Sequence, residues 1–153
     1  MPKTDPLGGD PQLASRFLLE IDGVEIGVFK SVSGLSLSID TQDLPEGGEN
    51  GFVHKLPGRM TWPNLTFKRG VTDGDALFTW INKTAGAGFS SNHNKLTRHT
   101  GAVTVIGYDG SRLRSYQLAD VFPVRWSGPT FDAESNAVLE EELEITHHGF
   151  VSK

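Results

Sequence analysis

The chain contains no cysteine, and this absence excludes disulfide bonds, thiol catalysis and metal sites built on cysteine. No apolar run approaches the ~18 residues that a membrane-spanning helix requires, so we expect no direct membrane insertion. The first twelve residues, MPKTDPLGGDPQ, lack the basic start and the apolar centre of a signal peptide. We therefore expect the protein to be synthesised and assembled in the cytoplasm.

Positive charge is also scarce, since 14 lysines and arginines stand against 19 acidic residues. The resulting net charge of −5 gives no electrostatic basis for specific binding of nucleic acid. The length of 153 residues suits a single domain. We place this domain at residues 15–153, behind a flexible N-terminal arm formed by residues 1–14.

Alternation of apolar and polar residues, which is typical of β-strands, dominates the chain. Asp22-Gly23 and Asp109-Gly110 each lie between two such stretches and indicate tight hairpins. Leu35, Leu37 and Ile39 are expected to share the buried face of a strand whose other face is wet. The expected strands are residues 15–22, 24–29, 35–41, 61–69 from Pro63 onward, 102–108, 113–118, 121–126 and 136–147.

One segment, residues 72–84, has helical spacing instead. Thr72 and Asp75 are spaced as in a helix N-terminal cap, and Leu77, Trp80 and Ile81 are expected to pack on the core. The predicted fold is therefore mainly β, an antiparallel sandwich or barrel with one flanking α-helix and a long extended loop.

Signals for catalysis are lacking. The sequence has no phosphate-binding loop, nucleophile elbow or dinucleotide fingerprint, and its five histidines show no metal-ligand spacing. Four acids lie within residues 140–144, where Glu141 shares a face with the apolar residues and the other three line a solvated stripe. We expect no enzyme activity, no catalytic residue, no metal and no cofactor.

Several segments, taken in order, resemble the tail tube family of contractile-tailed phages and phage-derived contractile injection systems. The resemblance covers about residues 15–150. The segments are IDG (21–23), GVFKSVSGLS (27–36), EGGEN (46–50), KLPG (55–58), LTFKRG (65–70), LFTWI (77–81), the DG hairpin (109–110), FPVRWSGP (122–129) and ELEITHHG (142–149).

This resemblance implies a structural protein with a β-barrel-like fold that type VI secretion tube proteins share. It implies hexameric rings that stack into a rigid inner tube, with sheath and baseplate proteins as partners and translocated cargo in the lumen. It also implies that the protein is part of a phage tail or of an injection particle, and we favour the particle. One departure is His148, where the family leads us to expect an acidic residue.

The glycine-rich stretch PEGGENGFVHKLPG, residues 45–58, carries apolar side chains that a solvated loop does not need. We expect bends at its glycines and at Pro57-Gly58, with an extended arm between them that reaches a neighbouring subunit. The alternative is that this arm folds back over its own barrel. The residues expected at the subunit interface are Glu46, Gly47, Gly48, Glu49, Asn50, Phe52, Val53, His54, Lys55 and Leu56.

A different class of function stays open from the residues alone. A monomeric ligand-binding β-sandwich, such as a glycan-binding module, would expose Trp62 or Trp126 as a binding platform. An enzyme is a more distant third alternative.

Overall fold

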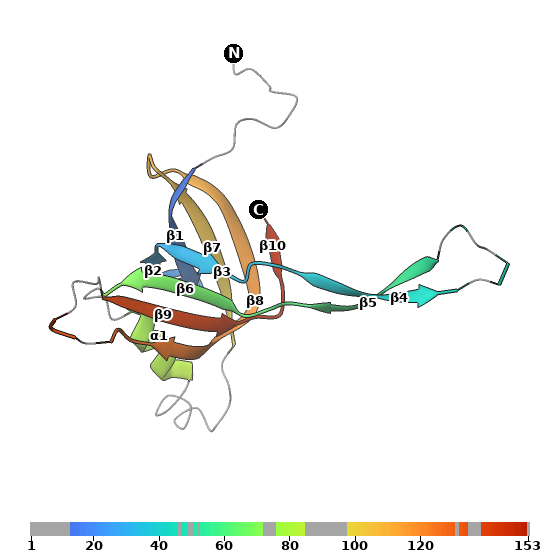
Figure 1. Cartoon of the computed structure of the whole chain (residues 1–153). Coiled ribbons are helices and arrows are strands. Elements are labelled where there is room, and N and C mark those ends of the chain that lie inside the picture. Colours follow the sequence, from blue (N-terminus) through green and yellow to red (C-terminus); the bar gives the residue numbers. More distant parts are fainter. Residues whose placement is uncertain are drawn as a thin grey trace, which may run out of the picture.

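Ten β-strands and one α-helix form the regular structure of the residues that the computed structural model describes, which are 13–45, 47–48, 51, 53–71, 76–84, 98–130, 132–134 and 139–152. Figure 1 shows a rolled body from which one hairpin projects. The first strands are β1 (Ala14–Ile21), β2 (Val24–Phe29), β3 (Ser31–Ser33), β4 (Ser38–Leu44), β5 (His54–Thr61) and β6 (Leu65–Gly70). After helix α1 (Ala76–Thr84) come β7 (His99–Gly107), β8 (Arg112–Ser127), β9 (Glu140–Thr146) and β10 (Phe150–Ser152).

The body is one eight-stranded antiparallel sheet that curls until its two edges meet. Its strand order is β2-β1-β7-β8-β9-β6-β3, and β10 pairs with β8 beside this path. The two edge strands, β2 and β3, are separated in the chain by Lys30 alone. The Lys30 N–H donates to the Lys68 carbonyl at 2.9 Å. Because neighbours in sequence lie at opposite edges, the sheet must close on itself, which confirms the predicted mainly β, barrel-like fold.

The first predicted hairpin is confirmed in position and turn type. Ile21 pairs with Val24 across the turn. Asp22 has a φ of 51° and Gly23 a φ of 79°, and a type I′ turn requires positive φ at both central positions. The second hairpin, β7–β8, turns at Asp109-Gly110 as predicted, with the Gly110 N–H bonded to the Gly107 carbonyl at 3.0 Å.

Helix α1 covers one opening of the curled sheet and contacts β2 and β8. Leu77 and Trp80 are buried, and Ile81 is half-buried against the same core. Residues 72–75, assigned above to the helix start, lie outside the described residues. The buried core is formed by Leu19, Ile21, Ile26, Phe29, Leu65, Phe67, Leu77, Trp80, Val103, Leu118, Val121, Leu143 and Ile145.

An ion pair lies in the core between neighbouring strands. Arg69 on β6 pairs with Glu141 on β9, and the two residues are only 6% exposed. The Arg69 guanidinium also lies over the Phe29 ring, 5.2 Å from its centroid. A Cβ at Gly27 would come within 2.4 Å of the guanidinium, so glycine at this position leaves the space that the arginine occupies.

Two strand predictions for the C-terminal half are wrong. Residues 113–118 and 121–126 are parts of one 16-residue strand, β8. Asp120 has a φ of 51°, and the register shifts between Pro123 and Arg125. These irregularities bend the strand so that it leaves β7 and continues beside β9. The segment 136–147 is also not the last strand, because β10 follows it and pairs with β8.

Gly34 lies where the backbone closely approaches that of Asn64, and a substitution there tests how close this approach is. It has a φ of 89°, and a Cβ there would lie 2.1 Å from the Asn64 carbonyl oxygen. Gly23 has a similar φ of 79° with open space around it. We expect Gly23→Ala to lower the free energy of unfolding by about 1–2 kcal/mol through backbone strain. Gly34→Ala should lower it by a further ~1–3 kcal/mol, because the methyl group overlaps backbone. Urea unfolding of both variants measures the difference, and equal losses would contradict the close approach.

Candidate assembly surface

The most exposed regular structure is the two-stranded ribbon formed by β4 and β5, residues 38–61, hereafter the ribbon. It is a separate sheet that shares no strand with the body. Figure 1 shows it pointing away from the curled sheet. Every residue of both strands is exposed. An isolated two-stranded hairpin is at best marginally stable in water, so this element calls for a partner surface.

Two predictions on this region are wrong. The alternation in residues 35–41 is that of a strand, but the strand begins at Ser38 and both its faces are solvent-exposed, because β5 alone pairs with it. The stretch 45–58 is not a loop throughout, because β5 begins at His54. Pro57-Gly58 does not make a bend but lies within β5, where the register shifts opposite Ile39 and Thr41. A Cβ at Gly58 would lie 3.1 Å from the Asp40 carbonyl oxygen, so glycine accommodates this irregularity.

The ribbon carries large apolar side chains on both faces. Ile39 lies opposite Met60, and Thr41 lies opposite Pro57. Since alternate residues share a face, Ile39, Pro57 and Met60 lie together near the body, and we name them the base patch. On the other face, Leu44 and Leu56 are diagonal neighbours nearer the tip, and we name them the tip patch. The exposed fractions of Ile39, Met60, Leu44 and Leu56 lie between 45% and 48%.

Charged residues accompany these patches. Asp43 lies directly opposite Lys55, and oppositely charged cross-strand pairs favour one register of a hairpin. Both edges of the ribbon present backbone groups that no other strand of the described residues pairs. Open edges and exposed apolar faces together are an aggregation hazard for a monomer, unless a specific partner covers them.

The expected interface residues fall partly within this element. Gly47 and Gly48 lie at its turn, Val53 precedes β5, and His54, Lys55 and Leu56 lie in β5. Glu46, Glu49, Asn50 and Phe52 lie outside the described residues. Ile39, Leu44 and Met60 are further exposed apolar residues of the ribbon that were not among the residues expected at the interface. Their signal was present as alternation, but Ile39 was assigned to the core.

The acidic stripe is neutralised by basic residues of the same chain. Lys30 pairs with Glu140, and Arg125 binds Glu142 at 2.9 Å and Glu144 at 3.3 Å. Lys68 lies 3.8 Å from Glu142. Glu140, Glu142 and Glu144 lie on the solvent-accessible face of β9, as expected, and they form a network of ion pairs with Lys30, Lys68 and Arg125. Exposed pairs of this kind each contribute little to stability.

The network lowers the pKa of one of its carboxyl groups, that of Glu140. The hydrogen bond from Lys30, followed by the charge of Lys30 and then that of Lys68, lowers the pKa of Glu140 below its ordinary value. We expect Lys30→Ala to raise the pKa of Glu140 toward that value, and Lys68→Ala to raise it less. Because the folded pKa is depressed, the associated stabilisation is present at neutral pH and is lost as the pH falls through the folded pKa. Carboxyl ¹³C shifts followed over an acid titration test this, and an unchanged pKa in Lys30→Ala would contradict it.

The two exposed aromatic platforms considered above are partly covered by the chain itself. Trp126 packs edge-to-face on Phe78, with ring centroids 4.9 Å apart. Trp62 packs in the same way on Phe150, at 5.0 Å.

Within the described ranges, no group of three or more histidine or acidic residues could hold a metal ion. No described helix is both long and apolar enough to cross a membrane.

Comparison with known proteins places this geometry in context. The model of the family described as T4-like virus tail tube protein gp19 matches residues 13–151. No curated protein matches the chain.

Solved structures share the whole fold. A chain of an extracellular contractile injection system, the PVC sheath/tube terminator in the extended state, is 27% identical with a TM-score of 0.75, covering 95% of this chain and 98% of that one. A chain of the anti-feeding prophage tube terminating cap is 25% identical with a TM-score of 0.75, covering 100% and 99%. A type six secretion system protein, 11% identical with a TM-score of 0.54 and covering 91% and 83%, has a similar fold.

Proposed function

Because the chain belongs to the T4-like virus tail tube protein family, we propose that it forms hexameric rings that stack into the rigid inner tube of a contractile injection particle. The observation that carries this proposal is the ribbon, because every apolar side chain of its two strands β4 and β5 is exposed in the single chain. Contacts that close under rotation give a ring, and contacts that repeat along an axis give a filament. A tube needs both kinds, so each copy must present at least two separate contact surfaces.

The ribbon provides two such surfaces. The base patch and the tip patch lie on opposite faces and at different distances from the body. A flat neighbour could cover only one of them, so burying both requires two neighbours or a groove between two. We therefore assign the base patch and the tip patch to different neighbouring copies. This assignment extends the expectation that the arm reaches a neighbouring subunit, and it replaces the alternative in which the arm folds back.

Paired variants test the proposal. Ile39→Ser/Met60→Ser removes the apolar part of the base patch, and Leu44→Ser/Leu56→Ser removes the tip patch. Burying such a side chain in a contact contributes about 1.5–3 kcal/mol, so each double variant should raise the concentration needed for assembly more than tenfold. Sedimentation velocity and negative-stain microscopy of the full chain measure the loss of rings and tubes. We expect one variant to retain isolated rings and the other to lose rings altogether.

A matched control comes from the same ribbon. Asp43→Ser/Lys55→Ser also changes two facing residues, but it removes no large apolar side chain. Circular dichroism should show all three proteins folded, since none of the substituted residues is buried. Tubes of normal length in both patch variants would overturn the role of the ribbon. A full chain that stays monomeric at every concentration would count against tube formation itself.

Two observations bear on the alternatives. Trp62 and Trp126 are engaged in aromatic contacts with Phe150 and Phe78, which disfavours a glycan-binding platform. The matched structures at 25–27% identity belong to an extracellular contractile injection system and the anti-feeding prophage, and this favours the particle over a phage tail. Capsid and terminase genes near the gene of this protein would reverse that choice. In the particle, we expect sheath and baseplate proteins outside the tube and cargo inside it.

A further inference from the structure

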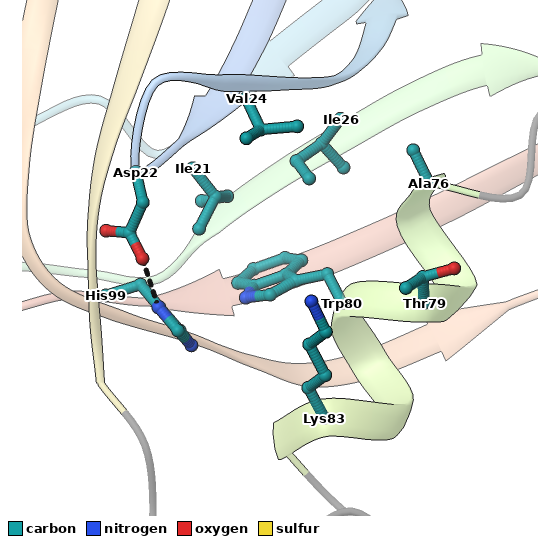
Figure 2. A pocket seen from close by; sticks show the side chains of 9 residues that line it. All are labelled: Ile21, Asp22, Val24, Ile26, Ala76, Thr79, Trp80, Lys83 and His99. Atoms are coloured by element: carbon teal, nitrogen blue, oxygen red, sulfur yellow. Dashed lines mark hydrogen bonds and ion pairs between the residues drawn. The ribbon is translucent and has the colours of Figure 1, made fainter.

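A pocket of about 340 Å³ lies between helix α1, the β1–β2 hairpin and the start of β7 (Figure 2). Its volume lies at the lower end of the range typical of small-molecule sites, about 300–1,000 Å³. One part of its wall is apolar and is formed by Ile21, Val24, Ile26 and Ala76. The remaining wall carries polar groups from three separate elements, which makes the pocket more than a packing defect.

Trp80 contributes a buried donor without an acceptor. The side chain is 4% exposed, and its indole Nε1–H has no hydrogen-bond partner among the residues that the structure describes. An indole nitrogen can only donate, and buried polar groups of native proteins are nearly always bonded. Figure 2 shows the nitrogen-bearing edge of this ring on the side of His99. A ligand in the pocket would supply the missing acceptor.

His99 contributes a second unpartnered atom. Its Nδ1 lies 2.5 Å from Oδ2 of Asp22, and because an ionised carboxylate only accepts, Nδ1 carries the proton. Oδ1 of Asp22 accepts the Thr100 N–H at 3.0 Å. Both carboxylate oxygens are thus already bonded, while His99 Nε2 is buried and has no partner. The pocket therefore holds one carboxylate whose two oxygens already accept hydrogen bonds. It also holds two ring nitrogens, Trp80 Nε1 and His99 Nε2, that have no partner among the described residues.

Lys83, in the last turn of α1, adds an ammonium group to the same wall. No ion pair of Lys83 is found within the described part of the chain. From this surplus of donors beside an apolar wall, we propose that the pocket binds a carboxylate carried on a short aliphatic chain. One oxygen accepts from the Trp80 Nε1–H, and the carboxylate as a whole faces the Lys83 ammonium. The chain lies against Ile21 and Ile26.

Calorimetric titration of the full chain with hexanoate tests this site, with hexanol and hexylamine as probes of the same chain length. We expect hexanoate to bind at least tenfold more tightly than hexanol, because a charge-assisted hydrogen bond has no counterpart in the alcohol. Hexylamine should bind at least tenfold more weakly than hexanoate, since its ammonium would lie beside that of Lys83. Lys83→Met should weaken hexanoate binding about tenfold and leave hexanol unaffected. Absence of hexanoate binding, or equal binding of all three probes, would overturn the proposal.

A spectroscopic signature separates this site from others on the surface. The chain has three tryptophans, and the indole ¹⁵N–H signal of Trp80 is assigned by its loss in Trp80→Phe. Hexanoate should shift this signal and leave those of Trp62 and Trp126 in place. Shifts confined to the other two tryptophans would place the ligand elsewhere and contradict the assignment.

Sedimentation of the assembled protein distinguishes two sources of the carboxylate, a free small molecule and a side chain of a neighbouring copy. Hexanoate that binds without changing sedimentation identifies a free small carboxylate as the natural occupant. Hexanoate that dissociates the assemblies identifies a carboxylate side chain of a neighbouring copy. The site itself is tested by the calorimetry, so it can fail while the proposed tube stands, and the reverse also holds.

Discussion

A chain in which residues 39–60 are replaced by an Asn-Gly turn is expected to fold normally and to lose all higher-order assembly. Ser38 and Thr61 are cross-strand partners at the base of the ribbon, so a two-residue type I′ turn can join them directly. None of the described residues between them belongs to the buried core. Stability should therefore change little, while the apolar patches on both faces disappear.

The measurement compares the excised chain with the full chain at the same concentration. Circular dichroism and thermal unfolding should give a similar β spectrum and a midpoint within a few degrees. Sedimentation and microscopy should show a monomer where the full chain gives rings or tubes. If the excised chain still forms long tubes, the ribbon is not an assembly element. If it unfolds, the ribbon is part of the folding unit.

Arg69→Met is expected to be the most destabilising single substitution in the body. It leaves Glu141 buried without its cation, and removal of one partner from a buried ion pair typically costs about 3–5 kcal/mol. Because small domains have total stabilities of only about 5–15 kcal/mol, this loss should lower the unfolding midpoint by many degrees. Urea unfolding at neutral pH gives the free energy directly.

The double variant Arg69→Met/Glu141→Leu is the control. It replaces the pair by apolar side chains of similar size, and such replacements are often neutral or stabilising. Recovery of most of the lost stability would attribute the effect of Arg69→Met to the uncompensated carboxylate. If the double variant is as unstable as the single one, the contribution of Arg69 comes instead from packing on Phe29.

The parts of the fold that sequence could predict are those fixed by neighbouring residues. The β1–β2 hairpin depends on Asp22-Gly23 and on two flanking strands, and all of these lie within 16 residues. The buried face of α1 depends on spacing alone, which places Leu77 and Trp80 together. The resemblance to the family depended on short motifs that occur in a fixed order along the chain. Such an order can be seen in the sequence without knowledge of distant contacts.

The parts that failed depend on what covers a strand. Alternation around Ile39 predicts an amphipathic strand, but it does not tell whether the second layer comes from the same chain or from another. The length of β8 was missed because the alternation of buried and exposed residues is interrupted at Ala119 and Asp120, where the strand bends instead of ending. The partner of Glu141 was missed because Arg69 lies 72 residues away in the chain.

The pairing of strands also sets the order in which the molecule can fold. β1 pairs with β7 and β6 pairs with β9, each across about half of the chain length, so closure of the body depends on contacts between distant segments. Domains dominated by such contacts fold in milliseconds to seconds, whereas a hairpin forms in about 1–10 microseconds. The ribbon needs only residues 38–61, so its strands can pair and separate many times before the body closes, since an isolated hairpin is at best marginally stable. The slow step of folding therefore lies in the closure of the body, and the apolar side chains of β4 and β5 stay exposed before and after it.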